Sequence, residues 1–296
     1  MPRLPLVSVV DKLEDAAWLD PAASTVSGSV RKNMPGQPAV TDLLHGVPLG
    51  HPLHPAMVAV PLGAWVSAAV LDLLPGNERA ARTLVGFGAL AAVPTALTGV
   101  TDFSQLETQQ QRVGIVHEAS NVLATALFAC SWAARRRGNH GIGKILSFAG
   151  LAAAGIGGFL GGHLAYRQGA GVNRNEDLPE EVPDGWHPLG PVDGFPMDQP
   201  VPASLGNVPL LVLRTEAADD GVSVLAGTCS HLGGPLNEGH LEEVRGQLCV
   251  VCPWHGSTFS VASGEVVHGP ATAPQPVFQT RVRAGQLEVS LTGAGE

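Results

Sequence analysis

Four long apolar runs between residues 43 and 165 constrain the fold of this 296-residue chain more than any other feature. The runs cover residues 56–74, 80–100, 114–134 and 145–165. A helix that crosses the hydrocarbon core of a bilayer needs about 20 apolar residues, which is the length of each run. The few charged residues in the runs, such as Asp72 and Arg82, lie near the ends, where a bilayer tolerates them better. The pattern therefore predicts an α-helical bundle of four membrane spans.

The fourth run is also rich in glycine, which lets the backbones of neighbouring helices approach closely. Its glycines are Gly155, Gly157, Gly158, Gly161 and Gly162. The alternative is a soluble all-α bundle, but the helices of such a bundle usually show a polar face, which these runs lack. The sequence favours the membrane bundle.

The last third of the chain has short apolar runs separated by Gly, Asp, Asn or Pro, which is the pattern of a small all-β domain. The expected strands are residues 209–214, 222–226, 247–251, 258–261, 277–282 and 287–291. The predicted fold is multidomain. Its parts are an N-terminal arm (1–42), the four-helix membrane domain (43–165), a linker (166–184) and the all-β domain (185–292). A fully extended linker would reach at most about 65–70 Å, so it would allow the β domain to swing.

The N-terminal arm is expected to be a loosely packed segment on the surface. Residues 9–19 could form one short amphipathic helix, ended by Pro21. The alternative for this helix is an interfacial position on a bilayer.

Two cysteine–histidine pairs in the β domain point to a metal centre. Cys229 and His231 are two residues apart, and Cys252 and His255 are three apart. Two thiolates and two imidazoles suit either an iron–sulfur cluster or zinc. A zinc finger places its two cysteines before its two histidines, whereas each pair here holds one of each, so the iron–sulfur alternative is favoured.

These pairs, the Leu-Gly after His231 and the Trp-His-Gly-Ser around His255 resemble the signature of Rieske [2Fe–2S] domains. The resemblance covers about residues 185–292. It implies that Cys229 and Cys252 bind one ferric iron and that His231 and His255 bind the iron that changes valence. It also implies a supporting shell around the cluster, made of Gly233, Gly256 and Ser257, and tight loops at Gly233, Gly234 and Gly256.

Two departures from the Rieske proteins of cytochrome bc complexes indicate a subclass. Those proteins carry an extra cysteine in each loop, joined as a disulfide, and the matching residues here are Gly234 and Trp254. They also carry a tyrosine that bonds the cluster, where this chain has Phe259. The domain is therefore similar to the ferredoxins of ring-hydroxylating oxygenase systems.

Histidines also gather near the ends of the expected spans. With four spans running up and down, His51, His54, His117 and His163 are expected on one membrane face, together with Asp102 and Glu118. One hypothesis is a haem or quinone site that exchanges electrons with the cluster. The alternative is that these histidines anchor helix ends by hydrogen bonds. The helical block also resembles an uncharacterised family of four-helix membrane proteins with His-Pro near the first span.

The remaining sequence favours an electron-transfer function. A net charge of −9 gives no support to nucleic-acid binding. No dinucleotide fingerprint occurs, and no second His/His/carboxylate set follows the β domain. We therefore expect a one-electron carrier in a lipid bilayer, serving a reductase, oxygenase or oxidase component, rather than a complete enzyme. The alternatives are a quinol-oxidising subunit and a redox sensor or assembly factor.

The protein is expected in a bacterial cell membrane, and the sequence gives conflicting signals about which face of that membrane carries the β domain. Most of the basic residues lie in the loop between the first and second spans and in the loop between the third and fourth spans. By the positive-inside rule these two loops are cytoplasmic, so both termini would lie outside. A Rieske cluster is inserted in the cytoplasm, and the chain shows no twin-arginine signal to export a folded domain. The two arguments point to opposite faces.

The missing tyrosine predicts a low reduction potential. Fewer hydrogen bonds to cluster sulfur destabilise the reduced, more negative state. We expect a midpoint potential nearer about −150 mV than +300 mV, the two ends of the Rieske range. Protein-film voltammetry measures it, and a midpoint above zero contradicts the assignment to the ferredoxin subclass.

Overall fold

The computed structural model describes residues 5–34, 36–216, 218 and 221–291. The expected outer limits at residues 1 and 292 therefore lie outside the described part. The chain divides into two compact units. The helical unit contains Met1–Gly36 and Leu53–Ala170, and the β unit contains Gln37–Pro52 and Gly171–Glu296.

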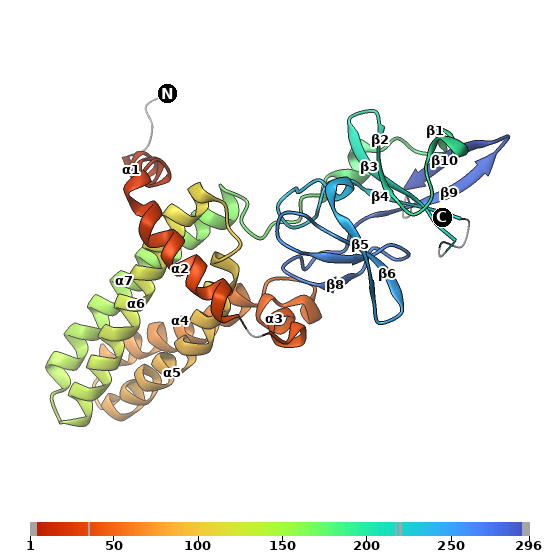
Figure 1. The fold of residues 1–296 in the computed structure, drawn as a ribbon. Helices are drawn as coiled ribbons and strands as arrows, with labels where there is room; N and C mark the ends of the chain where they lie inside the picture. Colours follow the sequence, from red (N-terminus) through yellow and green to blue (C-terminus); the bar gives the residue numbers. More distant parts are fainter. Residues whose placement is uncertain (1–4, 35, 217, 219–220, 292–296) are drawn as a thin grey trace. The chain divides into compact units, whose positions relative to one another are not determined.

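Four long helices form the body of the helical unit (Figure 1). They are α4 (Leu53–Asp72), α5 (Glu78–Phe103), α6 (Thr108–Arg136) and α7 (His140–Tyr166). All four are long and apolar enough to cross a membrane. Helix α4 packs on α5 and α7, and α6 packs on α5 and α7. The predicted four-span bundle is confirmed, with each helix extending a few residues beyond its apolar run at one or both ends.

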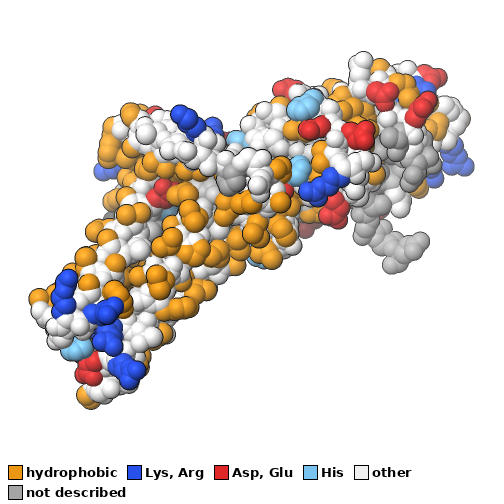
Figure 2. All heavy atoms as spheres, turned by 60° about the horizontal axis from the view of Figure 1, so that its bottom comes forward, with side chains coloured by type: hydrophobic (Ala, Val, Ile, Leu, Met, Phe, Trp, Pro, Cys, Tyr) orange, Lys and Arg blue, Asp and Glu red, His pale blue; other side chains and the backbone are white. Residues whose placement is uncertain are grey.

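The helical unit is apolar on the outside and partly polar within. Leu90 is 75% exposed and Ile145 is 70% exposed, whereas Thr98 and Ser131 are buried. Figure 2 shows hydrophobic side chains over much of the surface of the helices, with one group of Lys and Arg at the lower left end of the unit and others toward its opposite end. A bilayer solvates such an apolar surface, and it drives polar groups to the inside of the bundle or to the helix ends.

A buried ion pair joins three helices at one end of the bundle. Arg135 of α6 donates two hydrogen bonds to the two carboxylate oxygens of Asp72 in α4, at 2.7 and 2.6 Å. Neither side chain is exposed. Helix α7 takes part through Ser147, 3.2 Å from Arg135 Nη2, and through Lys144, whose Nζ donates to the backbone oxygen of Asp72 at 2.7 Å. Every charge in this cluster therefore has a partner, as a low-dielectric site requires.

The N-terminal arm differs from the expected single helix at residues 9–19. Helix α1 (Pro5–Glu14) ends earlier, a short η1 (Ala17–Leu19) follows, and α2 (Asp20–Asn33) begins beside Pro21. The prediction that Pro21 ends a helix was wrong. In the first turn of a helix the missing N–H of proline has no partner to lose, so proline can begin a helix there.

The arm also packs on the bundle instead of lying loosely. Arg112 of α6 donates to Asp20 Oδ1 at 2.6 Å and to the backbone oxygen of Glu14 at 2.8 Å. His163 Nε2 of α7 lies 2.6 Å from Glu14 Oε1.

The β unit is built from two antiparallel sheets (Figure 1). The first has the order β1-β10-β9-β4-β3-β2, and the second has the order β5-β6-β7-β8. The strands are β1 (His187–Pro191), β2 (Pro200–Leu205), β3 (Val208–Arg214), β4 (Val222–Ala226), β5 (His240–Val244), β6 (Gln247–Val251), β7 (Thr258–Ser260), β8 (Val266–His268), β9 (Val277–Arg283) and β10 (Gln286–Leu291). The predicted all-β domain is confirmed, and each of the six expected strands is present.

The four strands that the sequence pattern did not predict are the four edge strands, β1, β2, β5 and β8. Edge strands tolerate proline and charge because one side of the backbone has no strand to pair with. Strands β1 and β2 each contain two prolines, and β5 contains Glu242 and Glu243. Their apolar alternation is therefore weak.

The inner strand β3 joins two hydrophobic clusters. Leu210 and Val212 point into one cluster with Val224, and Leu211 and Leu213 point into the other. A strand buried on both faces has a continuous apolar run instead of alternation. The sequence Val-Pro-Leu-Leu-Val-Leu of β3 is of that kind.

Two stretches outside the expected β domain belong to the β unit. Residues 37–52, which contain α3 (Pro38–His45) and η2 (Val47–Leu49), were expected in the arm and the membrane domain. Residues 171–184, expected as a linker, also join it: Arg174 N–H donates to Ser230 O at 3.0 Å, and Leu178 and Val182 are buried in the β core. Most of the expected linker is therefore packed on the β unit.

The buried ion pair generates a stability prediction. Asp72→Ala or Arg135→Ala leaves the other charge buried without its partner, so each is expected to lower the free energy of unfolding by about 3–5 kcal/mol. The double variant Asp72→Leu/Arg135→Met removes both charges, so it is expected to be more stable than either single variant. Denaturant unfolding in detergent, followed by helical circular dichroism, measures these values.

The matched control for this experiment is Arg167→Ala. Arg167 pairs with Asp11 at 2.7 Å and is 48% exposed, and exposed pairs contribute less than about 1 kcal/mol. A single variant of the buried pair that is no less stable than this control contradicts the prediction.

Candidate metal centre

Two loops of the β unit hold the four predicted ligands, and the two loops close in the same way. In the loop after β4, Cys229 N–H donates to Gly234 O at 2.8 Å, and Gly233 N–H donates back to Cys229 O at 3.0 Å. In the loop between β6 and β7, the Cys252 N–H donates to Ser257 O at 2.8 Å, and the Gly256 N–H donates back to Cys252 O at 3.0 Å. Each cysteine is therefore bonded to the fourth and fifth residues after it.

A glycine is needed at the fourth position of both loops. Gly233 has φ of 81° and Gly256 has φ of 75°, which is left-handed backbone that glycine adopts without steric cost. The two sequence motifs differ in where the histidine lies, but they share this Cys-to-Gly spacing. The resemblance implied tight loops at these glycines, and the structure places both glycines in tight turns.

Backbone N–H groups surround both sulfur atoms. Cys229 Sγ accepts from the N–H groups of His231 and Leu232, and Cys252 Sγ accepts from those of Trp254 and His255. The two cysteine side chains also hydrogen-bond each other. That bond, with burial, raises the pKa of Cys229, and the same bond is the largest cause that lowers the pKa of Cys252 to about 6. The four N–H donors stabilise negative charge on sulfur and so favour the thiolate, which is the form of cysteine that binds metal.

The two histidine rings lie together at the same place. The ring centroids of His231 and His255 are 5.1 Å apart, with the ring planes at 90°. Within the described part of the chain, the Nδ1 atom of His231 is buried without a hydrogen-bond partner. Burial, followed by the charges of His255, His45 and Arg174, lowers the pKa of His231 to about 3. His231 is therefore a neutral imidazole, the state in which histidine binds a metal.

This donor set fits a two-iron cluster. The described residues include no group of three or more His, Cys, Asp or Glu side chains placed to hold one metal ion. A structural zinc site takes four ligands around one ion, whereas each iron of a Rieske cluster takes only two from the protein. Two adjacent thiols, two adjacent imidazoles and an unpartnered buried Nδ1 match the second arrangement.

Gly234 and Trp254 hold the two loops against each other. A Cβ atom added at Gly234 would lie 2.9 Å from Cys252 Sγ and 3.1 Å from the Trp254 ring. These are the two positions matched to the paired cysteines of cytochrome bc Rieske proteins, and here they are in contact. Phe259, at the position of the tyrosine, is fully buried in the hydrophobic core.

Sequence reasoning missed one residue that supports the first loop, the buried Gln275. Its Oε1 accepts the Ser230 N–H at 3.1 Å, and its Nε2 donates to Ala226 O at 2.6 Å and to Thr228 O at 2.7 Å. It thus fixes the backbone on both sides of Cys229. The only signal in the sequence was a polar residue between two prolines, which is typical of an exposed loop.

The membrane histidines have protein partners of their own. His54 Nδ1 lies 3.0 Å from Thr95 O, His117 Nδ1 lies 2.7 Å from Gly157 O, and His163 pairs with Glu14. The rings of His54 and His117 approach each other, with centroids 6.3 Å apart. His51 belongs to the β unit and bonds Pro52 O at 3.1 Å. His54 and His117 therefore join neighbouring helices through backbone oxygens, α4 to α5 and α6 to α7.

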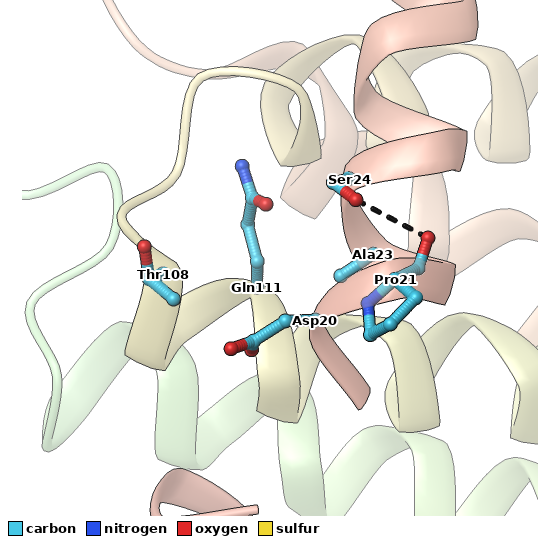
Figure 3. Close-up of a pocket in the computed structure, with 6 residues that line it drawn as sticks. All are labelled: Asp20, Pro21, Ala23, Ser24, Thr108 and Gln111. Atoms are coloured by element: carbon cyan, nitrogen blue, oxygen red, sulfur yellow. Dashed lines mark hydrogen bonds between the residues drawn. The ribbon is translucent and has the colours of Figure 1, made fainter. Parts of the chain in front are cut away.

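A pocket of about 470 Å³ opens in the helical unit where α2 and α6 begin (Figure 3). It is lined by Asp20, Pro21, Ala23, Ser24, Thr108 and Gln111. The carboxylate of Asp20 is already bound by Arg112 at 2.6 and 2.9 Å. The pocket contains none of the predicted site residues.

Comparisons with known proteins match the two units separately. Residues 50–174 match a family described as predicted membrane protein (DUF2231), and residues 185–279 match the Rieske [2Fe-2S] domain. Neither match supports haem or quinone at the membrane histidines.

Three curated relatives show where the likeness lies. The ferredoxin subunit of anthranilate 1,2-dioxygenase from Burkholderia cepacia is 34% identical over 106 residues, which are 36% of this chain and 92% of that subunit. Ferredoxin CarAc from Metapseudomonas resinovorans is 34% identical over 86 residues, 29% of this chain and 74% of that protein. A Rieske domain-containing protein from Homo sapiens is 40% identical over 48 residues, 16% of this chain and only 31% of that protein.

The two ferredoxins are covered over most of their length, so the likeness extends to a whole domain of their kind. The [2Fe–2S] cluster expected from the sequence is thereby confirmed. Through its β unit the chain belongs to the Rieske [2Fe–2S] family, and it is an electron carrier that four apolar helices anchor in a membrane.

Proposed function

We propose that Cys229, His231, Cys252 and His255 hold the cluster, and that the protein passes single electrons from a reductase to an oxygenase or oxidase component at a bacterial cell membrane. The observation that carries this proposal is the pair of equivalent loops, each closed by the same two backbone bonds around one cysteine. When bound, a [2Fe–2S] cluster supplies one-electron chemistry.

The residues of the two loops prepare the site for such a group. Four backbone N–H donors favour negative charge at sulfur, and burial keeps both cysteines away from water. Gly234 lets the loops meet without a side chain between them. These features hold the ligands in place before a metal arrives, which lowers the reorganisation that accompanies electron transfer.

The exposed side of the second loop is the proposed contact with the partner. Trp254 is 51% exposed, and its ring lies 6.4 Å from the partly exposed ring of His255. An exposed aromatic side chain beside a metal ligand is a good anchor for a transient protein contact.

The charge of the β unit indicates the kind of partner. Residues 171–296 carry 16 Asp and Glu against 5 Arg and no Lys. An acidic carrier is steered toward a basic docking surface, and salt weakens this attraction. The Burkholderia cepacia relative, whose name makes it the ferredoxin subunit of anthranilate 1,2-dioxygenase, supports a protein partner of this class.

The ligand assignment is tested by substitution. His231→Ala and Cys252→Ser are each expected to abolish the Rieske EPR signal of the reduced protein and leave membrane insertion unchanged, because the ligands lie in the β unit. His240→Ala is the matched control, since His240 is an exposed histidine of the same unit. Retention of the signal in either ligand variant overturns the assignment.

The electron-transfer role is tested by stopped-flow reduction of the purified protein in detergent. A ferredoxin reductase with NADH is expected to reduce the cluster quickly, at a rate that falls steeply as ionic strength rises. Ubiquinol or menaquinol alone is expected to leave the cluster oxidised. Fast reduction by a quinol, with none by the reductase, contradicts the proposal and favours a quinol-oxidising subunit.

A further inference from the structure

Residues 37–52, here termed the cap segment, bring a carboxylate to the β unit from far away in the sequence. Asp42 of α3 is only 9% exposed. Its Oδ2 lies 2.9 Å from His268 Nδ1, and its Oδ1 accepts the N–H of Gly269 at 2.9 Å. One side chain thus bonds both the last residue of β8 and the first residue after it.

The cap segment also packs closely on this loop. A Cβ atom added at Gly269 would lie 3.0 Å from Val47 Cγ2 and 3.5 Å from His45 Cβ. His45 itself is buried. The hydrogen bonds of Asp42 are therefore shielded from water, which makes them stronger than bonds on an open surface.

The loop held by Asp42 leads directly to the metal centre. Two residues after Gly269, the N–H of Ala271 donates to Ser257 Oγ at 2.9 Å. Ser257 is fully buried, and its backbone oxygen closes the Cys252 loop by accepting the Cys252 N–H. A hydroxyl oxygen that accepts a bond from Ala271 has its own hydrogen free to donate in another direction.

The cap segment is an addition to the family domain. The match to the Rieske [2Fe-2S] domain covers residues 185–279, and the cap segment precedes the first membrane span. Asp42 therefore acts on the metal centre from outside the matched sequence.

We propose that Asp42 is a positioning residue for the metal centre. It fixes residues 269–271 and, through the Ala271 N–H, orients the Ser257 hydroxyl as a hydrogen-bond donor to the cluster. A donor to the cluster stabilises the reduced state, so the cap segment raises the reduction potential. This inference rests on the proposed ligand set, because Ser257 supports the cluster only if Cys252 binds it.

The test compares two substitutions of Asp42 in the full-length protein. Asp42→Asn removes the charge but keeps an oxygen to accept from the Gly269 N–H and an amide group to bond the His268 ring. Asp42→Ala removes the charge and both bonds. The difference between their midpoint potentials therefore reports positioning alone. We expect Asp42→Ala to have the lower potential and altered EPR g-values, while Asp42→Asn keeps the wild-type g-values.

A double substitution asks whether Asp42 acts through Ser257. In a Ser257→Ala background the hydroxyl is absent, so Asp42→Ala and Asp42→Asn are expected to have equal potentials. Equal potentials of the two variants in the wild-type background overturn the proposal. A difference that persists unchanged in the Ser257→Ala background overturns it as well.

Hydrogen–deuterium exchange gives a readout that does not depend on cluster content. The peptide containing residues 266–272 is expected to exchange faster in Asp42→Ala than in Asp42→Asn, and equal exchange overturns the proposal. Asp20→Ala is the matched control: Asp20 pairs with Arg112 in the helical unit, so this variant is expected to leave the exchange of the peptide unchanged. If the wild-type protein has no Rieske EPR signal, the proposed function is refuted. If the wild-type signal is normal but Asp42→Ala and Asp42→Asn have the same potential and exchange, only this inference is refuted.

Discussion

The backbone hydrogen bonds that close the two cysteine loops determine where every other group of the metal centre lies. Each loop turns within five residues, so its cysteine sulfur faces inward and two N–H groups point at that sulfur. Gln275 holds the flanks of the first loop, and Ser257 joins the second to residues 269–271. Because backbone hydrogen bonds shape the loops, the left-handed glycines Gly233 and Gly256 are needed to bring the cysteines and histidines into place.

The two units satisfy buried polar groups in different surroundings. In the helical unit the surface is apolar, so the Arg135–Asp72 pair and the histidines find partners on neighbouring helices. In the β unit, buried polar groups such as Gln275 and Ser257 support the cysteine loops. The same rule, that a buried polar group needs a partner, explains why His54 and His117 bond backbone oxygens of neighbouring helices.

The β unit is assembled from parts of the chain that the sequence pattern assigned elsewhere. The cap segment and residues 171–184 carry too little apolar alternation to predict a place in a core. Their positions depend on single contacts, such as Asp42 with Gly269 and Arg174 with Ser230. Such contacts join residues far apart in sequence and leave no local pattern. The expected linker was too long for this reason.

The sequence by itself determined the four spans, the six inner strands and the expected ligand set. Each of these rests on a local signal: about 20 apolar residues, alternation by two, or a cysteine and a histidine within three residues of each other. Tertiary structure decided the edge strands, the role of Gln275, the place of the cap segment and the separate partners of the four membrane histidines. These depend on which backbone groups remain unpaired after the elements pack, and that is known only when distant parts of the chain have met.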